Sequence, residues 1–259
     1  MLEHMRELWK FRALIVGLVE RHMHARYRGS FLGMLWSFLN PLCLMAVYTL
    51  VFKYYIRFNQ VENYTIFLFC GLLQWIHVSS SLIEGSISVS AGGSLITKSL
   101  FPAALLPAVS VLTSLVHFVL SLPLLFLFML IFGVKFTGLL LVLPLLMVVQ
   151  TVFLYGVALA LATLNVAFRD VQHLVGNALT LLFFLSPILY PEDVVPVEFR
   201  PFLAFNPFAV FTSVYQDVLF HGVVPTAVEF GQLLVWSIVS VLVGIRVYVS
   251  RQEGFAEAL

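Results

Sequence analysis

Three arginines near the start of the chain are the residues best suited to bind a charged ligand. Arg21, Arg26 and Arg28 lie within one short segment, and a guanidinium group binds phosphate through paired, charge-assisted hydrogen bonds. The cluster is therefore a candidate contact for a phosphate group. The same charges would also set membrane topology and attract anionic lipid, and the sequence leaves both interpretations open.

The sequence offers no nucleotide-binding or metal-binding chemistry. Residues 92–99 resemble a phosphate-binding loop, but that loop needs glycine directly before its Lys-Ser pair, where this chain has Thr97. The two cysteines lie in apolar stretches and suit small core positions, so no metal site is expected. His77 and His117 also lie in apolar stretches, where a proton relay would need acidic partners that the sequence does not provide. Any ATP that drives this protein must therefore be hydrolysed by another chain.

Aromatic residues are candidates to line a conduit. The chain holds 25 Phe, 9 Tyr and 4 Trp, most of which should pack in the membrane or form belts at its surfaces. Flat rings near kinks and charged ends also suit the faces of sugar rings, while Tyr and Trp edges donate hydrogen bonds. The channel candidates are Trp36, Phe38, Tyr48, Tyr54, Tyr55, Phe184 and Tyr190.

Six long stretches without charge must position these residues. The chain is 61% hydrophobic and 10% charged, against about 25% charged in soluble proteins. A bilayer core of about 30 Å needs roughly 20 apolar residues as a helix, because each backbone polar group must be satisfied within its own segment. The sequence predicts an all-α integral membrane protein, with a domain at 29–259 whose six spans are 29–52, 63–83, 99–134, 136–168, 171–191 and 230–245.

The basic residues predict the orientation of these spans. With a cytoplasmic amino terminus, the inner segments hold ten Lys or Arg and the outer segments four, so the positive-inside rule places both termini in the cytoplasm of a multi-pass inner-membrane protein. Residues 1–28 predict an amphipathic helix in the cytoplasmic interface, with Phe11, Ile15 and Leu18 on its apolar side. That helix either only anchors the chain to lipid or also contacts a cytosolic partner. The net charge of +1 gives no indication of nucleic-acid binding.

The segment after the fifth span suggests an outer gate. Its apolar runs, 197–205 and 208–220, are each too short to cross a bilayer. A structureless loop of this length would be unusual, so we expect two short re-entrant or interfacial helices around Asn206-Pro207. Backbone that enters a membrane without crossing it must line a cavity or pack on protein. We expect a gate at about 192–225; the alternative is two helices lying on the outer headgroups.

Four motifs, in order along nearly the whole chain, resemble the membrane subunits of type-2 ABC exporters that move cell-surface polysaccharides, the Wzm-type permeases. The first runs from Arg26-Tyr27-Arg28 through a Leu-Gly-x-Leu-Trp pattern to Pro41. The others lie at 95–107, at 165–171 with 185–191, and at 206–222. This chain has Gln216 where the family often has arginine, so a charge-based role at that position is not expected.

The resemblance implies the channel-forming subunit of an ATP-driven exporter of lipid-linked polysaccharide, of the O-antigen, capsule or teichoic-acid type. It implies a homodimer with two cytosolic ATP-binding subunits, which would use ATP and Mg²⁺, while this chain would bind no cofactor and would not be an enzyme. The polymer would need a continuous channel because it is too long for a closed pocket, and the diphosphate of its polyprenyl carrier would contact Arg21, Arg26 and Arg28. The residues expected to couple to the ATPase are Lys98, Phe101, Pro102, Arg169 and Asp170, and those of the outer gate are Pro201, Asn206, Pro207 and Tyr215.

Two other functions stay open at this point. An ABC permease for a small molecule or lipid would have similar spans. An integral-membrane enzyme acting on a lipid-linked sugar would need acids or histidines converging at one membrane face. The acids of this chain are scattered, and the outer group of Glu192, Asp193, Glu198 and Asp217 lacks metal-ligand spacing.

Overall fold

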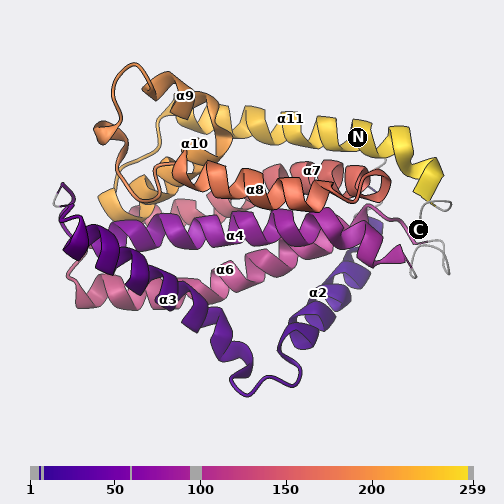
Figure 1. Ribbon diagram of the computed structural model, residues 1–259, viewed down its shortest axis with the longest axis horizontal. Coiled ribbons are helices and arrows are strands. Elements are labelled where there is room, and N and C mark those ends of the chain that lie inside the picture. Colours follow the sequence, from indigo (N-terminus) through magenta and orange to yellow (C-terminus); the bar gives the residue numbers. More distant parts are fainter. Residues whose placement is uncertain (1–5, 7–8, 59, 94–100, 256–259) are drawn as a thin grey trace.

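The computed structural model describes residues 6, 9–58, 60–93 and 101–255, which form a bundle of long helices (Figure 1). No strand occurs in these ranges, which confirms the predicted all-α fold. Five helical segments are long and apolar enough to cross a membrane. They are Gly33–Tyr55, which contains α3 (Trp36–Thr49); α4 (Tyr64–Ala91); α6 (Leu105–Ile131); Gly138–Ala167, which contains α7 (Leu143–Ala167); and Ala227–Gly254, which contains α11 (Ala227–Arg251).

Helix α4 is the centre of the bundle. Its side chains are mostly buried from Tyr64 to Leu82, as expected for a helix that is apolar on all sides. Helices α3, α6, α7, α8 and α10 pack around it. We predicted the end of this span near Glu84, but the helix continues to Ala91. The reason is that the small residues beyond Glu84 pack closely: a Cβ on Gly85 would lie 2.8 Å from the Cβ of Ala158 in α7.

Two glycines allow α7 and α11 to touch along their backbones. A side chain on Gly156 would collide with the backbone at Ser240 and Val241, and one on Gly244 would collide with Gly156. Small residues at such a crossing let two membrane helices approach closely, where dispersion contacts and not the hydrophobic effect hold them together.

The fifth predicted span is shorter as a helix than its uncharged stretch. Helix α8 (Val171–Phe184) has 14 residues, about 21 Å at 1.5 Å per residue. The helix ends before Ser186-Pro187, because proline has no backbone donor and disfavours helix in the residue before it. The predicted count of six spans is therefore not confirmed. Helix α8 runs back along α4 toward the end of the bundle that carries α9 (Figure 1).

Two short helices follow and meet at Asn206-Pro207, as predicted. Helix α9 (Arg200–Phe205) leaves most of its side chains exposed, whereas α10 (Pro207–Gln216) is largely buried against the bundle. Asn206 caps α10, because its side-chain oxygen accepts a hydrogen bond of 3.0 Å from the backbone N–H of Phe208. The two helices thus differ in environment, with α9 at the surface and α10 in the core.

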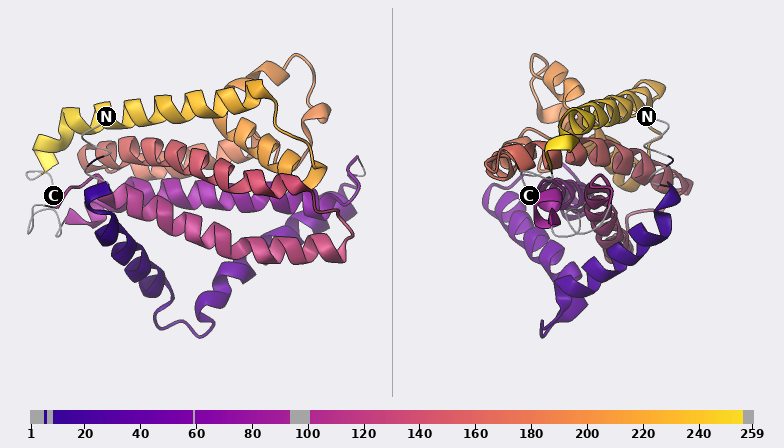
Figure 2. Two further views of the ribbon diagram at one scale, coloured as in Figure 1. Left: turned by 180° about the vertical axis from the view of Figure 1, so that it is seen from behind. Right: turned by 90° about the vertical axis from the view of Figure 1, so that its right-hand side faces the viewer.

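The amphipathic helix at the start of the chain packs on the protein itself. Ile15 of α2 (Arg12–Tyr27) is buried against Leu105 and Val109 of α6, with Phe11 and Leu18 beside it. The predicted apolar side is therefore the side that contacts α6. Helices α2 and α3 form a V whose turn lies level with the middle of α4 (Figures 1 and 2).

Candidate functional site

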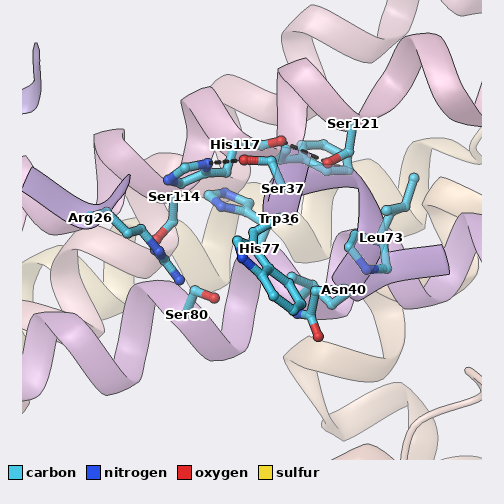
Figure 3. A pocket seen from close by; sticks show the side chains of 13 residues that line it. Arg26, Trp36, Ser37, Asn40, Leu73, His77, Ser80, Ser114, His117 and Ser121 are labelled. Carbon is cyan, nitrogen blue, oxygen red and sulfur yellow. Dashed lines mark hydrogen bonds between the residues drawn. The ribbon is translucent and has the colours of Figure 1, made fainter. Parts of the chain in front are cut away.

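A polar pocket lies between α3, α4 and α6. Its volume is about 270 Å³. His77, in its wall, stands 13 residues after the start of α4 and 14 before its end, so the pocket is near mid-length of one of the longest helices. Among the described residues that line it, Arg26 is the only charged one (Figure 3). The other lining residues are Trp36, Ser37, Asn40, Pro41, Leu73, Ile76, His77, Ser80, Ser114, His117, Phe118 and Ser121.

Helical spacing brings these polar side chains to one place. In α6, Ser114, His117 and Ser121 are three and four positions apart, so they share one face. In α4, His77 and Ser80 are three positions apart and therefore also share one face. From the sequence we ruled out a proton relay at the two histidines and did not predict this pocket. The signal available was this recurrence of polar residues at helical spacing within strongly apolar stretches.

Contacts within the pocket hold both imidazole rings. The His117 Nδ1 lies 3.3 Å from the Ser37 hydroxyl, which joins α6 to α3. The His77 Nδ1 lies 3.3 Å from the Ser81 hydroxyl, and its ring stacks on Phe118 with centroids 5.5 Å apart. In the described part of the chain, the buried Ser114 hydroxyl has no hydrogen-bond partner. A buried polar group normally finds one, so this hydroxyl is available to a water or a ligand.

An ion pair separates this pocket from a second hollow. The Arg26 Nη1 lies 2.8 Å from the Glu84 Oε1, and the two side chains are 43% and 33% exposed. Arg26 lines both spaces, while Arg21 and Glu84 line the second, which has a volume of about 640 Å³. Arg28 is exposed and lines a different hollow with Arg21. The three predicted arginines thus lie together on α2 and the turn after it, with Arg26 paired to α4.

The predicted coupling residues that the structure describes lie at the end of the bundle where α2 begins and α11 ends. Lys98 lies outside the described residues. Phe101 is half-buried beside Ile15, in the same apolar cluster as the start of α6. Arg169 and Asp170 are exposed in the turn between α7 and α8. This turn contacts the end of α11, because the Arg251 guanidinium lies 5.7 Å from the centre of the Phe168 ring.

Asn165, which we did not single out in the sequence, ties three helices together at that end. Its side-chain N–H donates to the Ser90 hydroxyl in α4 at 3.1 Å. Its side-chain oxygen accepts from the backbone N–H of Gln172 in α8 at 3.2 Å. The residue itself is 3% exposed. An amide in the last turn of a mostly apolar helix was the available signal.

The predicted channel aromatics lie on helical segments that flank α4, apart from Tyr190, which lies in the irregular segment after α8. Trp36, Tyr54, Tyr55 and Phe184 are exposed. The Tyr48 ring of α3 contacts the Phe183 ring of α8, with centroids 5.6 Å apart, and this contact connects the two helices beside α4. Phe38, Tyr48 and Tyr190 are half-buried.

The predicted gate residues do not gather in one place. Pro201 is exposed on α9, and the Asn206 amide lies 3.4 Å from the Ser186 hydroxyl, with Pro207 half-buried next to it. Tyr215 is fully buried, and its ring meets Phe118 edge-on with centroids 5.8 Å apart. Phe118 also stacks on His77, so an unbroken series of rings connects α10 with the polar pocket.

Comparisons with known proteins agree along almost the entire chain. Residues 13–220 match the ABC-2 type transporter family. The chain is 40% identical over 261 residues to the O-antigen export system permease protein RfbA of Myxococcus xanthus, with 100% of each chain covered. It is 31% identical to a protein of the same name from Klebsiella pneumoniae over 95% of each chain. It is 22% identical to the polysialic acid transport protein KpsM of Escherichia coli, over 93% of this chain and 95% of that one.

Proposed function

The chain belongs to the ABC-2 type transporter family, and we propose that it is the channel-forming membrane subunit of an ATP-driven exporter of lipid-linked polysaccharide. The observation that carries this proposal is the similarity to O-antigen export permeases, which extends over the full length of both chains. Five helical segments of membrane-spanning length agree with a transmembrane subunit. The polymer would cross the cytoplasmic membrane attached to a polyprenyl diphosphate.

We propose a homodimer that carries two cytosolic ATP-binding subunits. Helix α8 would complete a sixth crossing together with residues 185–190, and both termini would lie in the cytoplasm. The exposed aromatic side chains of α8 and of the segment Gly33–Tyr55, which contains α3, support a polymer path between two copies, because a second copy facing them would enclose a channel lined by flat rings. These residues include Trp36, Tyr54, Tyr55 and Phe184.

ATP and Mg²⁺ would act in the partner subunits, and this chain would bind no cofactor. Its contact with the ATPase would involve α2 and the residues Lys98, Phe101, Pro102, Arg169 and Asp170. Movement received at Phe101 would pass directly to α2 and α6, because it packs in the cluster that joins them. At the opposite end, α9 and α10 would form the gate, with Tyr215 acting through its packing in the core and not as a lining residue.

Arg21, Arg26 and Arg28 are the proposed contacts of the carrier diphosphate. All three are exposed on one short segment, where guanidinium groups would bind both phosphates. Replacing Arg26 and Arg28 together by Gln should abolish export while membrane insertion stays normal. Normal export by this double variant would contradict the carrier role.

The test of the function as a whole is a clean deletion in the native host, followed by locating the lipid-linked polysaccharide. We expect the polymer to disappear from the cell surface and to accumulate inside the cell, and the gene on a plasmid to restore it. Unchanged surface glycan would contradict the proposal and would favour a permease for a small molecule or lipid.

A further inference from the structure

The polar pocket between α3, α4 and α6 has the chemistry of a site for a phosphorylated sugar. Its one charged lining residue, Arg26, is cationic, and its other polar residues are neutral hydroxyl, amide and imidazole groups. A metal site usually takes three or more protein ligands such as imidazole, thiolate or carboxylate, and the described part of the chain holds no such group, so this lining does not suit a metal ion. It suits a ligand that is anionic at one end and rich in hydroxyl groups elsewhere.

Because of where the pocket lies, its polar side chains would be energetically costly to bury if neither a ligand nor water filled it. The wall at His77 stands 13 residues, about 20 Å of helix, from the start of α4. Polar groups at such depth are expensive in a membrane protein and usually mark a substrate path. The turn between α2 and α3 lies level with this part of the bundle, at the tip of a V that points away from α4 (Figures 1 and 2).

We infer that this pocket binds the sugar unit attached directly to the carrier diphosphate, with the phosphates at the Arg26 end. The inference rests on the proposed function and specifies which part of the substrate the protein recognises. Figure 3 shows Arg26, Ser80 and Ser114 gathered at one end of the pocket, so hydroxyl groups stand where the sugar would follow the phosphates. The unpartnered Ser114 hydroxyl would bond to the ligand.

The size of the pocket limits the ligand to about one ring. Sites for drug-sized molecules measure roughly 300–1,000 Å³, and this pocket measures about 270 Å³. It is too small to contain a polymer, so it would hold only the unit next to the carrier. Trp36 in its wall offers an aromatic ring to one face of that sugar.

The ion pair between Arg26 and Glu84 would open when the ligand enters. Arg26 lines both the pocket and the second hollow, so a diphosphate arriving through the second hollow would meet the guanidinium first. Phosphate binds a guanidinium at least as well as a carboxylate does, and Arg26 could exchange Glu84 for the ligand.

The test measures binding by the complex of this chain with its ATPase subunits, reconstituted in lipid nanodiscs. The probes are the lipid-linked glycan purified from the native host, polyprenyl diphosphate without sugar, and the glycan released from its lipid. We expect the wild-type complex to bind the sugar-bearing lipid about tenfold more tightly, as two additional hydrogen bonds would produce. The Ser80→Ala/Ser114→Ala variant should lose most of this difference and keep its affinity for the sugar-free lipid.

The control is Ser79→Ala, on the same helix, whose hydroxyl donates to the carbonyl of Ile76 and does not line the pocket. It should keep the tenfold difference. Equal affinity of the wild type for both lipids would overturn the inference and leave the proposed function intact. Binding of neither lipid would overturn both. Equally tight binding of glycan released from its lipid would assign the pocket to free sugar and overturn the lipid-linked assignment.

Discussion

Arg26 has two possible partners, the Glu84 carboxylate and a phosphate, and substitution can separate them. The ion pair is partly exposed, so by itself it should contribute at most about 1 kcal/mol to stability. If Arg26 only holds α2 against α4, exchanging the two charges should preserve its role. If Arg26 binds phosphate, the position of the positive charge matters and an exchange should not restore function.

We therefore predict that Arg26→Gln abolishes export and that Arg26→Glu/Glu84→Arg does not restore it, although the exchanged pair can form again. Export is measured as surface polysaccharide in the deletion host, with membrane insertion measured by immunoblot of the membrane fraction. Arg57→Gln is the control. Arg57 is exposed at the end of the bundle opposite the predicted coupling residues, so this variant should export normally. Recovery of export in the exchanged variant would show that the ion pair alone matters.

For Asn165 we predict an effect on the stability of the protein and not on transport. Asn165→Leu removes both bonds of the amide and leaves the backbone N–H of Gln172 without its acceptor. The loss should be about 1–3 kcal/mol, seen as a lower Tm of the protein purified in detergent. Gln172→Ala is the matched control, because it keeps the backbone N–H and alters only an exposed side chain. An unchanged Tm for Asn165→Leu would contradict the structural role of these bonds.

At the level of elements, the contact between α7 and α11 depends on having no side chain at two positions. Gly244→Leu should force these helices apart, because its side chain would enter the backbone of α7 at Gly156. Overpacking costs about 1–3 kcal/mol or more in a well-packed core. We expect loss of the monodisperse peak in size-exclusion chromatography. Gly231→Leu, in the same helix with no atom near its Cβ position, should elute normally; similar behaviour of the two variants would refute the contact.

The sequence predicted the elements well where hydrophobicity alone decides them. Helices α6 and α7 lie wholly in stretches without charge, and α4 and α11 lie mostly in such stretches, since burial or lipid contact requires apolar residues on nearly all sides. Ser186-Pro187 ends α8 although the stretch continues, because charge is not the only property that limits a helix. The pocket was missed for another reason: it depends on how α3, α4 and α6 are rotated about their axes. Hydropathy does not give the rotation of each helix about its axis, and it does not reveal that Glu84 faces Arg26.

For the whole molecule, α8 decides how many times the chain crosses the membrane. Its 14 residues span about 21 Å, short of a core of about 30 Å. The chain after it stays protected, because Ile188 and Leu189 are buried and the Leu189 carbonyl accepts a 2.8 Å hydrogen bond from the Tyr64 hydroxyl. Residues 185–190 can therefore complete a crossing as irregular backbone packed on protein, which a membrane tolerates.

Alkaline phosphatase fusions test this arrangement, because the enzyme needs disulfides that form only outside the cytoplasm. If α8 and residues 185–190 together cross the membrane, fusions after Lys135 and Asp193 should be active, whereas fusions after Asp170 and Glu253 should be inactive. Fluorescent-protein fusions at the same positions should give the reverse pattern. An inactive fusion at Asp193 would mean that α8 enters and returns on the same side. In that case α11 would run outward, and the end of the chain could not lie in the cytoplasm with its start.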